Sequence, residues 1–277
     1  MEKAVTFQIE QKQCLGILHL PTQAITTGVV IVVGGPQYRV GSHRQFVQLS
    51  RSLAQQNIAS FRFDYRGMGD SFGEKQSFEE ICDDIKHAID IFLKEQTEIK
   101  NVVIWGLCDA ASAALMYADK DKRVNGLVLL NPWLRNEQAM AQTMVKFYYL
   151  RRLLSRQFWK KLITGKVNVG GSIADVSGFV KDSINEKSVT EHSYQQRMEL
   201  GIQRYSGKTC LILSGVDLTA KEFEQQTHKH AGWQNLRSDT NEIHRIRHAD
   251  HTFSSSAFKQ QVEQITAQFV AKCNDTT

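Results

Sequence analysis

The sequence predicts an α/β protein with a mostly parallel central sheet and helices on both faces. Short β-branched runs alternate with longer stretches in which apolar residues recur at helical spacing, as over 46–53 and 81–92. This alternation indicates βαβ units and parallel strands. The expected strands lie at 28–33, 58–63, 102–105, 124–130, 209–213 and 242–246. The first, third and fourth of these runs are almost continuously apolar, which is typical of strands covered on both faces.

Two segments depart from this alternation. Near the start of the chain, Val5–Glu10 and Cys14–Leu20 flank a short polar stretch and predict an antiparallel hairpin added to the sheet edge. Farther along, roughly 75 residues separate the run that ends at Leu130 from the run that begins at Thr209, where a crossover normally needs far fewer. We therefore expect a core of residues 1–132 and 206–277 and an inserted helical cap or lid at 133–205.

The composition is that of an ordinary soluble globular protein. Of the 277 residues, 42% are hydrophobic and 23% are charged, which excludes a disordered, collagen-like or coiled-coil chain. No apolar run approaches the ~18 residues that a membrane span needs, and the first residues lack the order of a signal peptide. These features predict a cytoplasmic protein.

The cysteines lack the spacing of a metal site or a disulfide framework. There are five of them, with no CxxC pair, and an odd count cannot form a fully paired disulfide set. They are Cys14, Cys82, Cys108, Cys210 and Cys273. The sequence thus predicts no metal, and each cysteine has to be explained singly.

Cys108 stands where a strand passes sharply into a helix. The strand at 102–105 is followed by Gly-Leu-Cys-Asp-Ala, and a helix rich in alanine then begins. A residue on so sharp a turn has strained backbone angles, and the residues two before and two after it, Gly106 and Ala110, have to be small. The side chain of Cys108 would then leave the carboxyl end of the sheet above a helix N-terminus, which favours a thiolate. A buried structural cysteine is the common alternative, but this position predicts a nucleophile.

A thiol nucleophile needs a base and an acid that orients the base. In folds of this kind the acid and the base follow the last strands in that order, which selects Asp217 after 209–213 and His251 after 242–246. Asp217 could instead be a helix N-cap. Thr219 with Glu222 three residues later makes the better capping box, which would leave Asp217 free to orient His251.

The turn after the first parallel strand is a candidate oxyanion site. Acyl transfer needs N–H donors aimed at the developing oxyanion. The segment Gly34-Gly-Pro-Gln suggests the backbone N–H of Gln37, because Pro36 has none, and the second donor would be the N–H of Asp109. No GxGxxG follows this strand and no GxxxxGK[ST] occurs, so no nucleotide cofactor is expected.

A glycine-containing segment follows the strand at 58–63. It reads Asp64-Tyr-Arg-Gly-Met-Gly-Asp-Ser71. Asp64 or Asp70 could be catalytic, but the proposed triad already has its carboxylate. We favour a structural turn made by the glycines, with Arg66 paired locally.

Several strings in the chain resemble the α/β-hydrolase superfamily. These are Gly-Leu-Cys-Asp-Ala, Asp-Tyr-Arg-Gly-Met-Gly-Asp-Ser and Ala-Asp-His-Thr-Phe-Ser. The longer segments Gly34–Arg44, Trp105–Ala118 and Leu127–Arg135 resemble more narrowly the exosortase A system-associated hydrolase 1 family of exopolysaccharide loci. The resemblance implies an α/β-hydrolase fold and a role near bacterial exopolysaccharide biosynthesis.

The chain departs from the commonest hydrolase pattern at the nucleophile turn, where Cys108 replaces the usual serine and Ala110 the usual glycine. Dienelactone hydrolases and polyhydroxyalkanoate synthases resemble it in using cysteine there. A thiolate attacks esters and thioesters well, and the acyl group on sulfur can pass to water or to another acceptor.

The excess of positive over negative residues lies in the predicted cap. Residues 133–205 hold 12 Lys and Arg against 6 Asp and Glu, whereas the rest of the chain holds 22 against 23. Within it, Arg151, Arg152, Lys160 and Lys161 lie beside an apolar stripe of helical spacing. The simpler interpretation is a helix of the cap that covers the active site. The alternative is an acidic carrier protein, an anionic glycan or the surface of the inner membrane as a partner. Nucleic acid is not expected, because no known binding module is present.

Two hypotheses follow from these observations. The first is an esterase, thioesterase or acyltransferase with Cys108 as nucleophile, His251 as base, Asp217 as orienting acid and the N–H groups of Gln37 and Asp109 as oxyanion hole. The second is a non-catalytic partner of the polysaccharide assembly machinery that keeps the fold as a scaffold.

Overall fold

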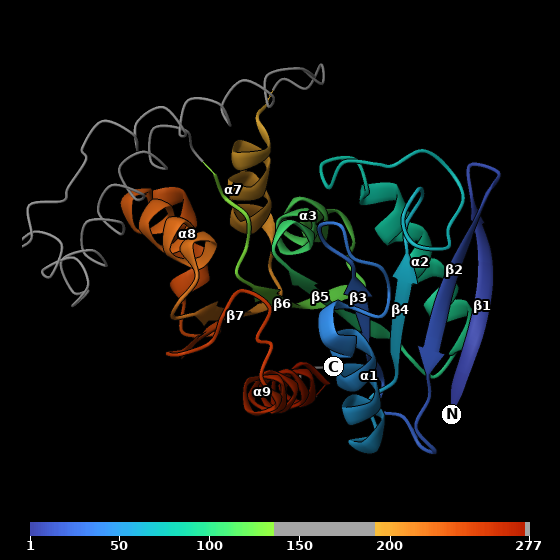
Figure 1. Ribbon diagram of the computed structural model, residues 1–277. Coiled ribbons are helices and arrows are strands. Elements are labelled where there is room, and N and C mark those ends of the chain that lie inside the picture. Colours follow the sequence, from blue (N-terminus) through green and yellow to red (C-terminus); the bar gives the residue numbers. More distant parts are fainter. Residues whose placement is uncertain (136–191, 275–277) are drawn as a thin grey trace, which may run out of the picture. The chain divides into compact units, whose positions relative to one another are not determined.

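The computed structural model describes residues 1–135 and 192–274 (Figure 1). The chain divides into two compact units, Met1–Arg135 with Tyr194–Thr277, and Asn136–Ser193. Residues 133–135 and 194–205, which the sequence suggests as part of the insertion, belong to the first unit. The helix over Tyr194–Arg204 is in this unit because it packs against the helix that follows Cys108.

The first unit is built on one sheet of eight strands. The strands are β1 Glu2–Ile9, β2 Lys12–His19, β3 Thr27–Val32, β4 Ser60–Asp64, β5 Asn101–Leu107, β6 Val124–Leu130, β7 Lys208–Ser214 and β8 Glu242–Ile246. Their order is β1-β2-β4-β3-β5-β6-β7-β8. β1 and β2 form the expected antiparallel hairpin, β2 pairs antiparallel with β4, and all later pairs are parallel.

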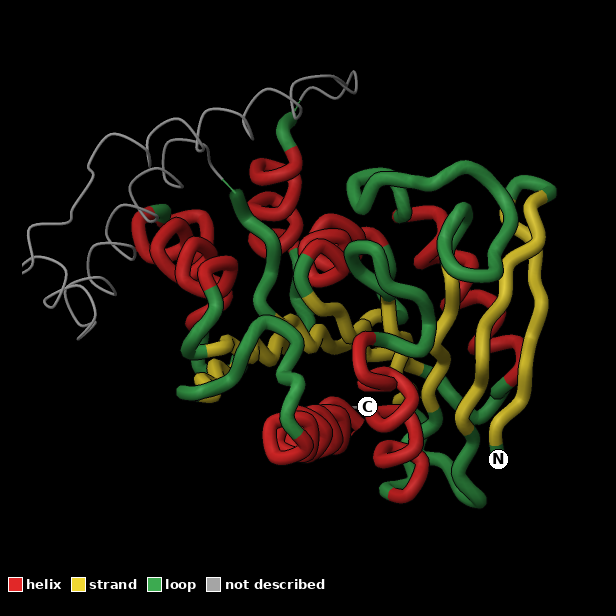
Figure 2. Tube along the Cα trace, viewed as in Figure 1, coloured by secondary structure: helices red, strands yellow, loops and turns green. Residues whose placement is uncertain are grey.

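Helices cover both faces of the sheet (Figure 2). The α-helices are α1 Gln45–Gln55, α2 Cys82–Glu95, α3 Asp109–Tyr117, α7 Tyr194–Arg204, α8 Leu218–Lys229 and α9 Ser256–Asn274, with short 3-10 helices η1 Ser42–Arg44, η2 Ala118–Lys120 and η4 Ala231–Arg237. α1 and α9 contact each other on one face, and α2, α3 and α7 lie on the other. No helix in the described part of the chain is long and apolar enough to cross a membrane.

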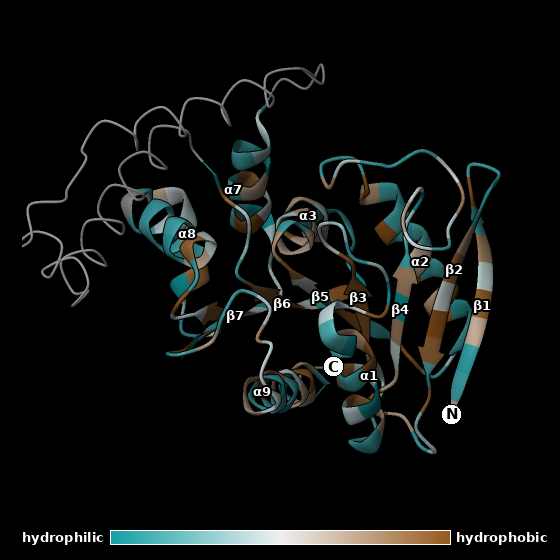
Figure 3. Ribbon diagram, in the orientation of Figure 1, coloured by the Kyte–Doolittle hydropathy of each residue, from teal (hydrophilic) through white to brown (hydrophobic). Residues whose placement is uncertain are grey.

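The core lies between the sheet and these two helix layers. All six residues of β3 are buried, and the inner strands are the most hydrophobic part of the ribbon (Figure 3). Trp105 of β5 packs edge-on against Phe46 of α1 at 5.5 Å between ring centroids. Gly28 makes room for an aromatic ring, since a Cβ there would lie 2.5 Å from Phe92. The expected α/β-hydrolase fold is confirmed.

The chain order of the strands determines where functional side chains meet. Parallel strands point their carboxyl ends to one edge of a sheet, and ligands bind in α/β proteins outside that edge. The segments that begin after β3, β5, β6, β7 and β8 all start there. Each carries polar side chains, which form the candidate site.

Candidate active site

Cys108 lies on a strained turn between β5 and α3. Its backbone angles are φ 62° and ψ −123°, a conformation that side-chain-bearing residues rarely adopt and that is typical of functional turns. Gly106 has to lack a side chain here, because a Cβ would lie 2.7 Å from the backbone of Ala110 and Ala111. The sharp turn that the small-residue pattern predicts is therefore present, and it leaves the Cys108 side chain half-buried.

Backbone hydrogen bonds on both sides hold the Cys108 turn. The Cys108 N–H donates to the Leu130 carbonyl at 2.9 Å, and the Trp133 N–H donates to the Cys108 carbonyl at 3.2 Å. The Cys108 carbonyl also accepts the first helical bond, from Ala111 at 3.1 Å. The turn is thus joined to the segment after β6 as well as to its own helix, which fixes the strained conformation.

His251 joins Asp217 and Cys108. Its Nδ1 lies 2.9 Å from Asp217 Oδ2, and the Cys108 side chain also acts on the pKa of the ring. Because Nδ1 is engaged by the carboxylate, Nε2 is the ring nitrogen left for the thiol. The hydrogen bond to Asp217 is the largest cause that raises the pKa of His251, to about 10, and the Cys108 contact adds to it against the effect of burial.

Asp217 has two tasks at the start of α8. Its carboxylate accepts the N–H groups of Thr219 at 3.3 Å and Ala220 at 3.1 Å, so it is the N-cap of this helix. The sequence-based expectation that Thr219 and Glu222 form the cap is wrong. A carboxylate has enough acceptor positions to cap the helix and to hold His251, and the side chain is only 9% exposed.

Sequence reasoning missed a buried amide–hydroxyl pair that holds the His251 loop. Asn131 follows β6 and donates from Nδ2 to the His251 carbonyl at 2.9 Å and to Ser214 Oγ at 2.8 Å. Ser214, the last residue of β7, donates from its N–H to Asn131 Oδ1 and from Oγ to the Asp250 carbonyl. The sequence signal was available, since Asn131 is a polar residue directly after a buried strand.

The loop after β3 is fixed at several points. Both carboxylate oxygens of Asp109 accept the Gly35 N–H, at 2.7 and 2.9 Å. The Gln37 side chain accepts the Ser42 N–H at 2.9 Å, and the Arg39 N–H donates to Asp64 Oδ1 at 2.6 Å. Gln37 and Asp109, the two sequence-predicted oxyanion residues, thus both take part in holding this loop through their side chains. The use of their N–H groups in catalysis remains a prediction.

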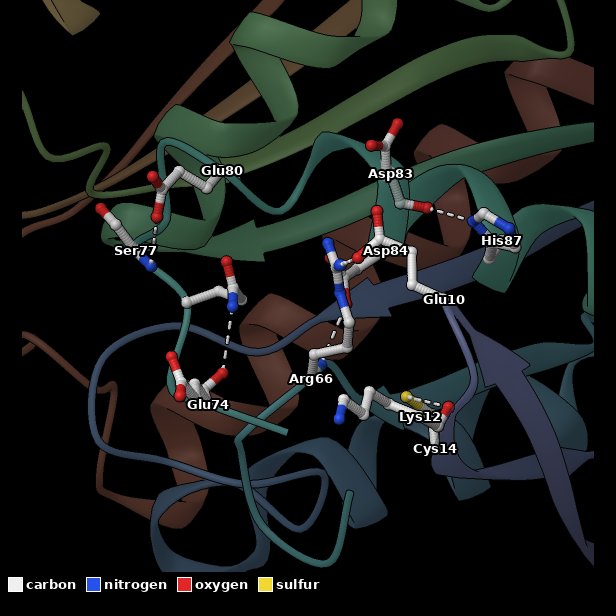
Figure 4. A network of polar contacts seen from close by, with 11 residues as sticks. Glu10, Lys12, Cys14, Arg66, Glu74, Ser77, Glu80, Asp83, Asp84 and His87 are labelled. Atoms are coloured by element: carbon white, nitrogen blue, oxygen red, sulfur yellow. Dashed lines mark hydrogen bonds and ion pairs between the residues drawn. The ribbon is translucent and has the colours of Figure 1, made fainter. Parts of the chain in front are cut away.

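The segment Asp64–Ser71 has no place in the His251 network. Gly67 and Gly69 have the positive φ values, 73° and 54°, that the turn requires, and Asp64 binds Arg39. Arg66 is not paired locally as expected. Its guanidinium contacts Asp84 of α2 at 2.8 to 3.2 Å and also Glu10 beyond β1 (Figure 4). The aspartates of this segment are therefore structural in their contacts.

Comparison with known proteins shows the family of the chain. The family described as serine aminopeptidase, S33, matches residues 26–200, which is more than half of the chain. The chain belongs to this family of α/β hydrolases. The family description specifies serine, whereas this hydrolase has Cys108 at the turn after β5.

Solved structures agree with this assignment at the level of the fold. The esterase Pf2001 of Pyrococcus furiosus superposes with a TM-score of 0.69 at 15% identity, covering 98% of this chain and 91% of that one. The dienelactone hydrolase of Anabaena variabilis superposes with a TM-score of 0.62 at 14% identity, covering 98% of this chain and 97% of that one. Est1E of Butyrivibrio proteoclasticus, with bound ferulic acid, superposes with a TM-score of 0.63 at 13% identity, covering 96% of this chain and 99% of that one. A search of curated proteins gave no match.

One group of potential metal ligands occurs within the described residues of this hydrolase. Cys210, Glu242 and His244 have ligand atoms that all lie within 4.8 Å of one another. Lys272 Nζ lies 2.6 Å from Glu242 Oε1, and His244 Nε2 lies 2.9 Å from Oε2 of the same carboxylate. The ammonium offsets the carboxylate charge, and burial raises the pKa of the Cys210 thiol. These contacts describe an ion-pair cluster at the sheet edge.

A cavity of about 650 Å³ lies away from Cys108, at the amino ends of β5, β6 and β7. It is lined by residues such as Asn101, Asp119, Lys122, Tyr205 and Lys208. Because the chemistry of this fold takes place at the carboxyl ends, this cavity does not belong to the candidate active site.

Other residues suggested by the sequence do not enter the site. The neighbouring histidines also lie outside it: His248 is exposed, and His244 belongs to the Glu242 cluster. The cations Arg151, Arg152, Lys160 and Lys161 lie outside the described residues.

Proposed function

We propose that this hydrolase cleaves an ester or thioester through a covalent acyl-enzyme on Cys108. The proposal rests on one observation above all: at the carboxyl edge of the sheet Asp217 is hydrogen-bonded to His251, and the pKa of His251 is raised by Asp217 and also by Cys108. The roles of Asp217, His251 and Cys108 are then those of an orienting acid, a base and a nucleophile.

The first half of the proposed reaction transfers the acyl group to sulfur. The sulfur of Cys108 attacks the carbonyl carbon, and His251 Nε2 holds the proton that the thiol gives up. When the tetrahedral intermediate collapses, the bond to the leaving alcohol or thiol breaks and His251 returns the proton to it. Asp217 holds Nδ1 and stabilises the imidazolium throughout.

The second half releases the acyl group. Water, or another hydroxyl acceptor in a transferase, loses its proton to His251 as its oxygen attacks the thioester carbon. The carbon–sulfur bond then breaks, and the proton passes from His251 to Cys108. Each proton taken up by His251 is thus returned within the same cycle.

The protonation of His251 supports a cysteine nucleophile. Its pKa, raised to about 10 by Asp217 and Cys108, favours imidazolium at neutral pH. An imidazolium beside a thiol stabilises the thiolate, the nucleophilic form of cysteine. A serine hydroxyl gains much less from such a partner, because its oxygen needs the base during attack.

The substrate class follows from the nucleophile and from the surroundings of Asp217. Val216 and Leu218, which flank Asp217, are 57% and 38% exposed, so apolar surface is available beside the triad for an acyl chain. The esterases and the dienelactone hydrolase among the structural neighbours act on ester bonds according to their names. We extend this to thioesters because thiolates exchange acyl groups with them readily.

The biological setting that we propose is bacterial exopolysaccharide biosynthesis, on the resemblance of Gly34–Arg44, Trp105–Ala118 and Leu127–Arg135 to exosortase-associated hydrolases. In this setting the cations Arg151, Arg152, Lys160 and Lys161 would recruit an acidic carrier or the surface of the inner membrane.

The test is a comparison of Cys108→Ala with Cys82→Ala on 4-nitrophenyl butyrate and on an acyl-thioester. Cys82 is also half-buried but lies in α2, so its variant controls for the loss of a thiol. We expect turnover and an acyl adduct on Cys108 in the wild type, full activity in Cys82→Ala and none in Cys108→Ala. Equal activity in the two variants would refute the proposal. If the wild type neither turns over these substrates nor shows rapid alkylation of Cys108, the result would favour a non-catalytic scaffold.

A further inference from the structure

The side chain of Asp109 makes contacts that its predicted role as an N–H donor does not require. Asp109 is the first residue of α3 and follows Cys108 directly. Its carboxylate accepts the N–H of Gly35 with both oxygens, at 2.7 and 2.9 Å, and the N–H of Ala110 at 2.9 Å. These bonds connect the helix that begins behind Cys108 to the loop that follows β3.

The carboxylate packs beneath this loop. Gly34 is buried, and a Cβ built on it would lie 2.3 Å from Asp109 Oδ1 and 2.5 Å from the Leu107 carbonyl. Gly35 has a φ of 61°, so the loop bends here in a conformation that glycine adopts at little cost. Both glycines of the pair thus fit the position of the Asp109 side chain.

Burying the Asp109 carboxylate here costs free energy, which its hydrogen-bond partners offset. Burial is the largest effect on Asp109 and raises its pKa, whereas the N–H groups of Gly35 and Ala110 and the charge of His251 act in the opposite direction. An apolar side chain would avoid the cost of burial but would leave the Gly35 N–H without this acceptor.

We propose that Asp109 is a positioning residue: its carboxylate, by binding the Gly35 N–H, sets the orientation of the loop that carries Gln37 and so completes the oxyanion hole. This inference rests on the proposed acyl-transfer function. Gln37 is two residues beyond Gly35, so a rotation of the Gly35 peptide moves the Gln37 N–H. Asp109 therefore acts twice, through its backbone N–H and through the loop that its side chain holds.

The position of an oxyanion donor matters in the transition state and much less in substrate binding. Asp109→Ala should accordingly lower kcat for 4-nitrophenyl butyrate by about 30-fold with little change in KM, less than the ~100-fold or more caused by removing a donor outright. Asp109→Asn keeps an acceptor oxygen for Gly35 and should recover to within about 5-fold of the wild type. Gly34→Ala should resemble Asp109→Ala, because its Cβ displaces Oδ1.

Two controls separate positioning from structural damage. Asp119→Ala removes another acid whose pKa is raised by burial, at the far end of α3, and should leave kcat unchanged. Alkylation of Cys108 by iodoacetamide forms no oxyanion, so its rate should not fall in Asp109→Ala even though turnover does.

The outcomes distinguish this inference from the proposed function. An active wild type with an equally active Asp109→Ala variant overturns the positioning role and leaves the triad intact. A more active Asp109→Ala variant would mean that the carboxylate blocks the oxyanion hole, which also overturns it. Parallel loss of kcat and of the alkylation rate would assign Asp109 to the stability of the turn. If the wild type neither turns over the ester nor alkylates faster than Cys108→Ala, the proposed function itself has failed.

Discussion

Two sets of buried carboxylates lie at the same edge of the sheet, and their partners differ. Asp64, the last residue of β4, and Asp84 of α2 have side chains with no exposed surface and bind the guanidinium groups of Arg39 and Arg66. Asp217, after β7, is nearly as buried and binds the imidazole of His251. A guanidinium stays charged at every accessible pH, whereas an imidazole can lose and regain a proton. The first pairs can only hold the structure, and the second can also carry out chemistry.

The largest expected effect tests whether the His251 side of this comparison depends on sulfur. Cys108→Ser should lower kcat/KM for 4-nitrophenyl butyrate by about 1,000-fold, since the serine hydroxyl cannot exist as the anion that an imidazolium stabilises. The folded structure should persist, which circular dichroism can verify. Activity equal to that of the wild type would contradict the thiolate mechanism.

A smaller kinetic effect should separate the two kinds of carboxylate. Asp217→Asn should reduce kcat about 100-fold by losing control of the His251 tautomer, and it should lower Tm at neutral pH only by what the ion pair with His251 contributes, because asparagine still caps α8. Asp64→Asn serves as the matched change at an arginine partner and should lower Tm more than kcat. A larger kinetic loss in Asp64→Asn would show that the acid has been misassigned.

The carboxylates paired with arginine are best tested by measuring the stability of the protein. Among the described residues, Asp84→Ala leaves the Arg66 guanidinium, whose side chain is 10% exposed, with the exposed Glu10 as its ion-pair partner. We expect a loss of about 3 kcal/mol in the free energy of unfolding. Urea unfolding measures it, with the exposed Asp83→Ala variant as control. A similar loss of unfolding free energy in both variants would mean that the Arg66–Asp84 pair stabilises the fold no more than an exposed carboxylate does.

The pH dependence of stability distinguishes a titrating pair from a fixed one. The pKa of His251 is raised from its ordinary value near 6.5 to about 10 in the folded state, so its contribution is fully present below pH ~6.5 and disappears as the pH rises through 10. The stability difference between wild type and His251→Gln should therefore shrink from pH 6 to pH 10. The difference for His248→Gln, at an exposed histidine, should stay near zero, and a constant difference for His251→Gln would contradict the raised pKa.

The smallest expected effect concerns the cations of the inserted segment. Neutralising Arg151, Arg152, Lys160 and Lys161 should raise KM for a substrate attached to an acidic carrier, while turnover of a small neutral ester stays unchanged. The difference should fade in high salt as the Debye length falls toward ~3 Å near 1 M. Equal losses on both substrates, independent of salt, would mean that these residues shape the insertion and do not recruit a partner.

Local patterns predicted the fold well, because strands and turns are encoded by neighbouring residues. All six parallel-sheet runs correspond to strands, and the span of β6, Val124–Leu130, is the one expected. The strained turn at Cys108 was predicted by the same kind of signal, since the small residues on either side of it meet a steric requirement within one turn.

Side-chain partners far apart in the sequence were harder to predict. Arg66 binds residues 18 and 56 positions away, and nothing local selects them. At α8, capping preferences of about 1 kcal/mol favour Thr219 or Asp217 almost equally, so the tertiary contact with His251 decides. Asn131 was overlooked for a similar reason, because its partners lie on β7 and on the His251 loop.

The pair formed by Asn131 and Ser214 has a consequence for the way the molecule opens. Among the described strands, β8 is the last of the sheet and pairs with β7 alone, so it is among the elements expected to fray first in local unfolding. The loop that follows β8 is anchored instead to the ends of β6 and β7, through the carbonyls of Asp250 and His251. Amide exchange at β8 can therefore be fast while His251 keeps its position, since the loop opens with the interior strands and not with the edge strand.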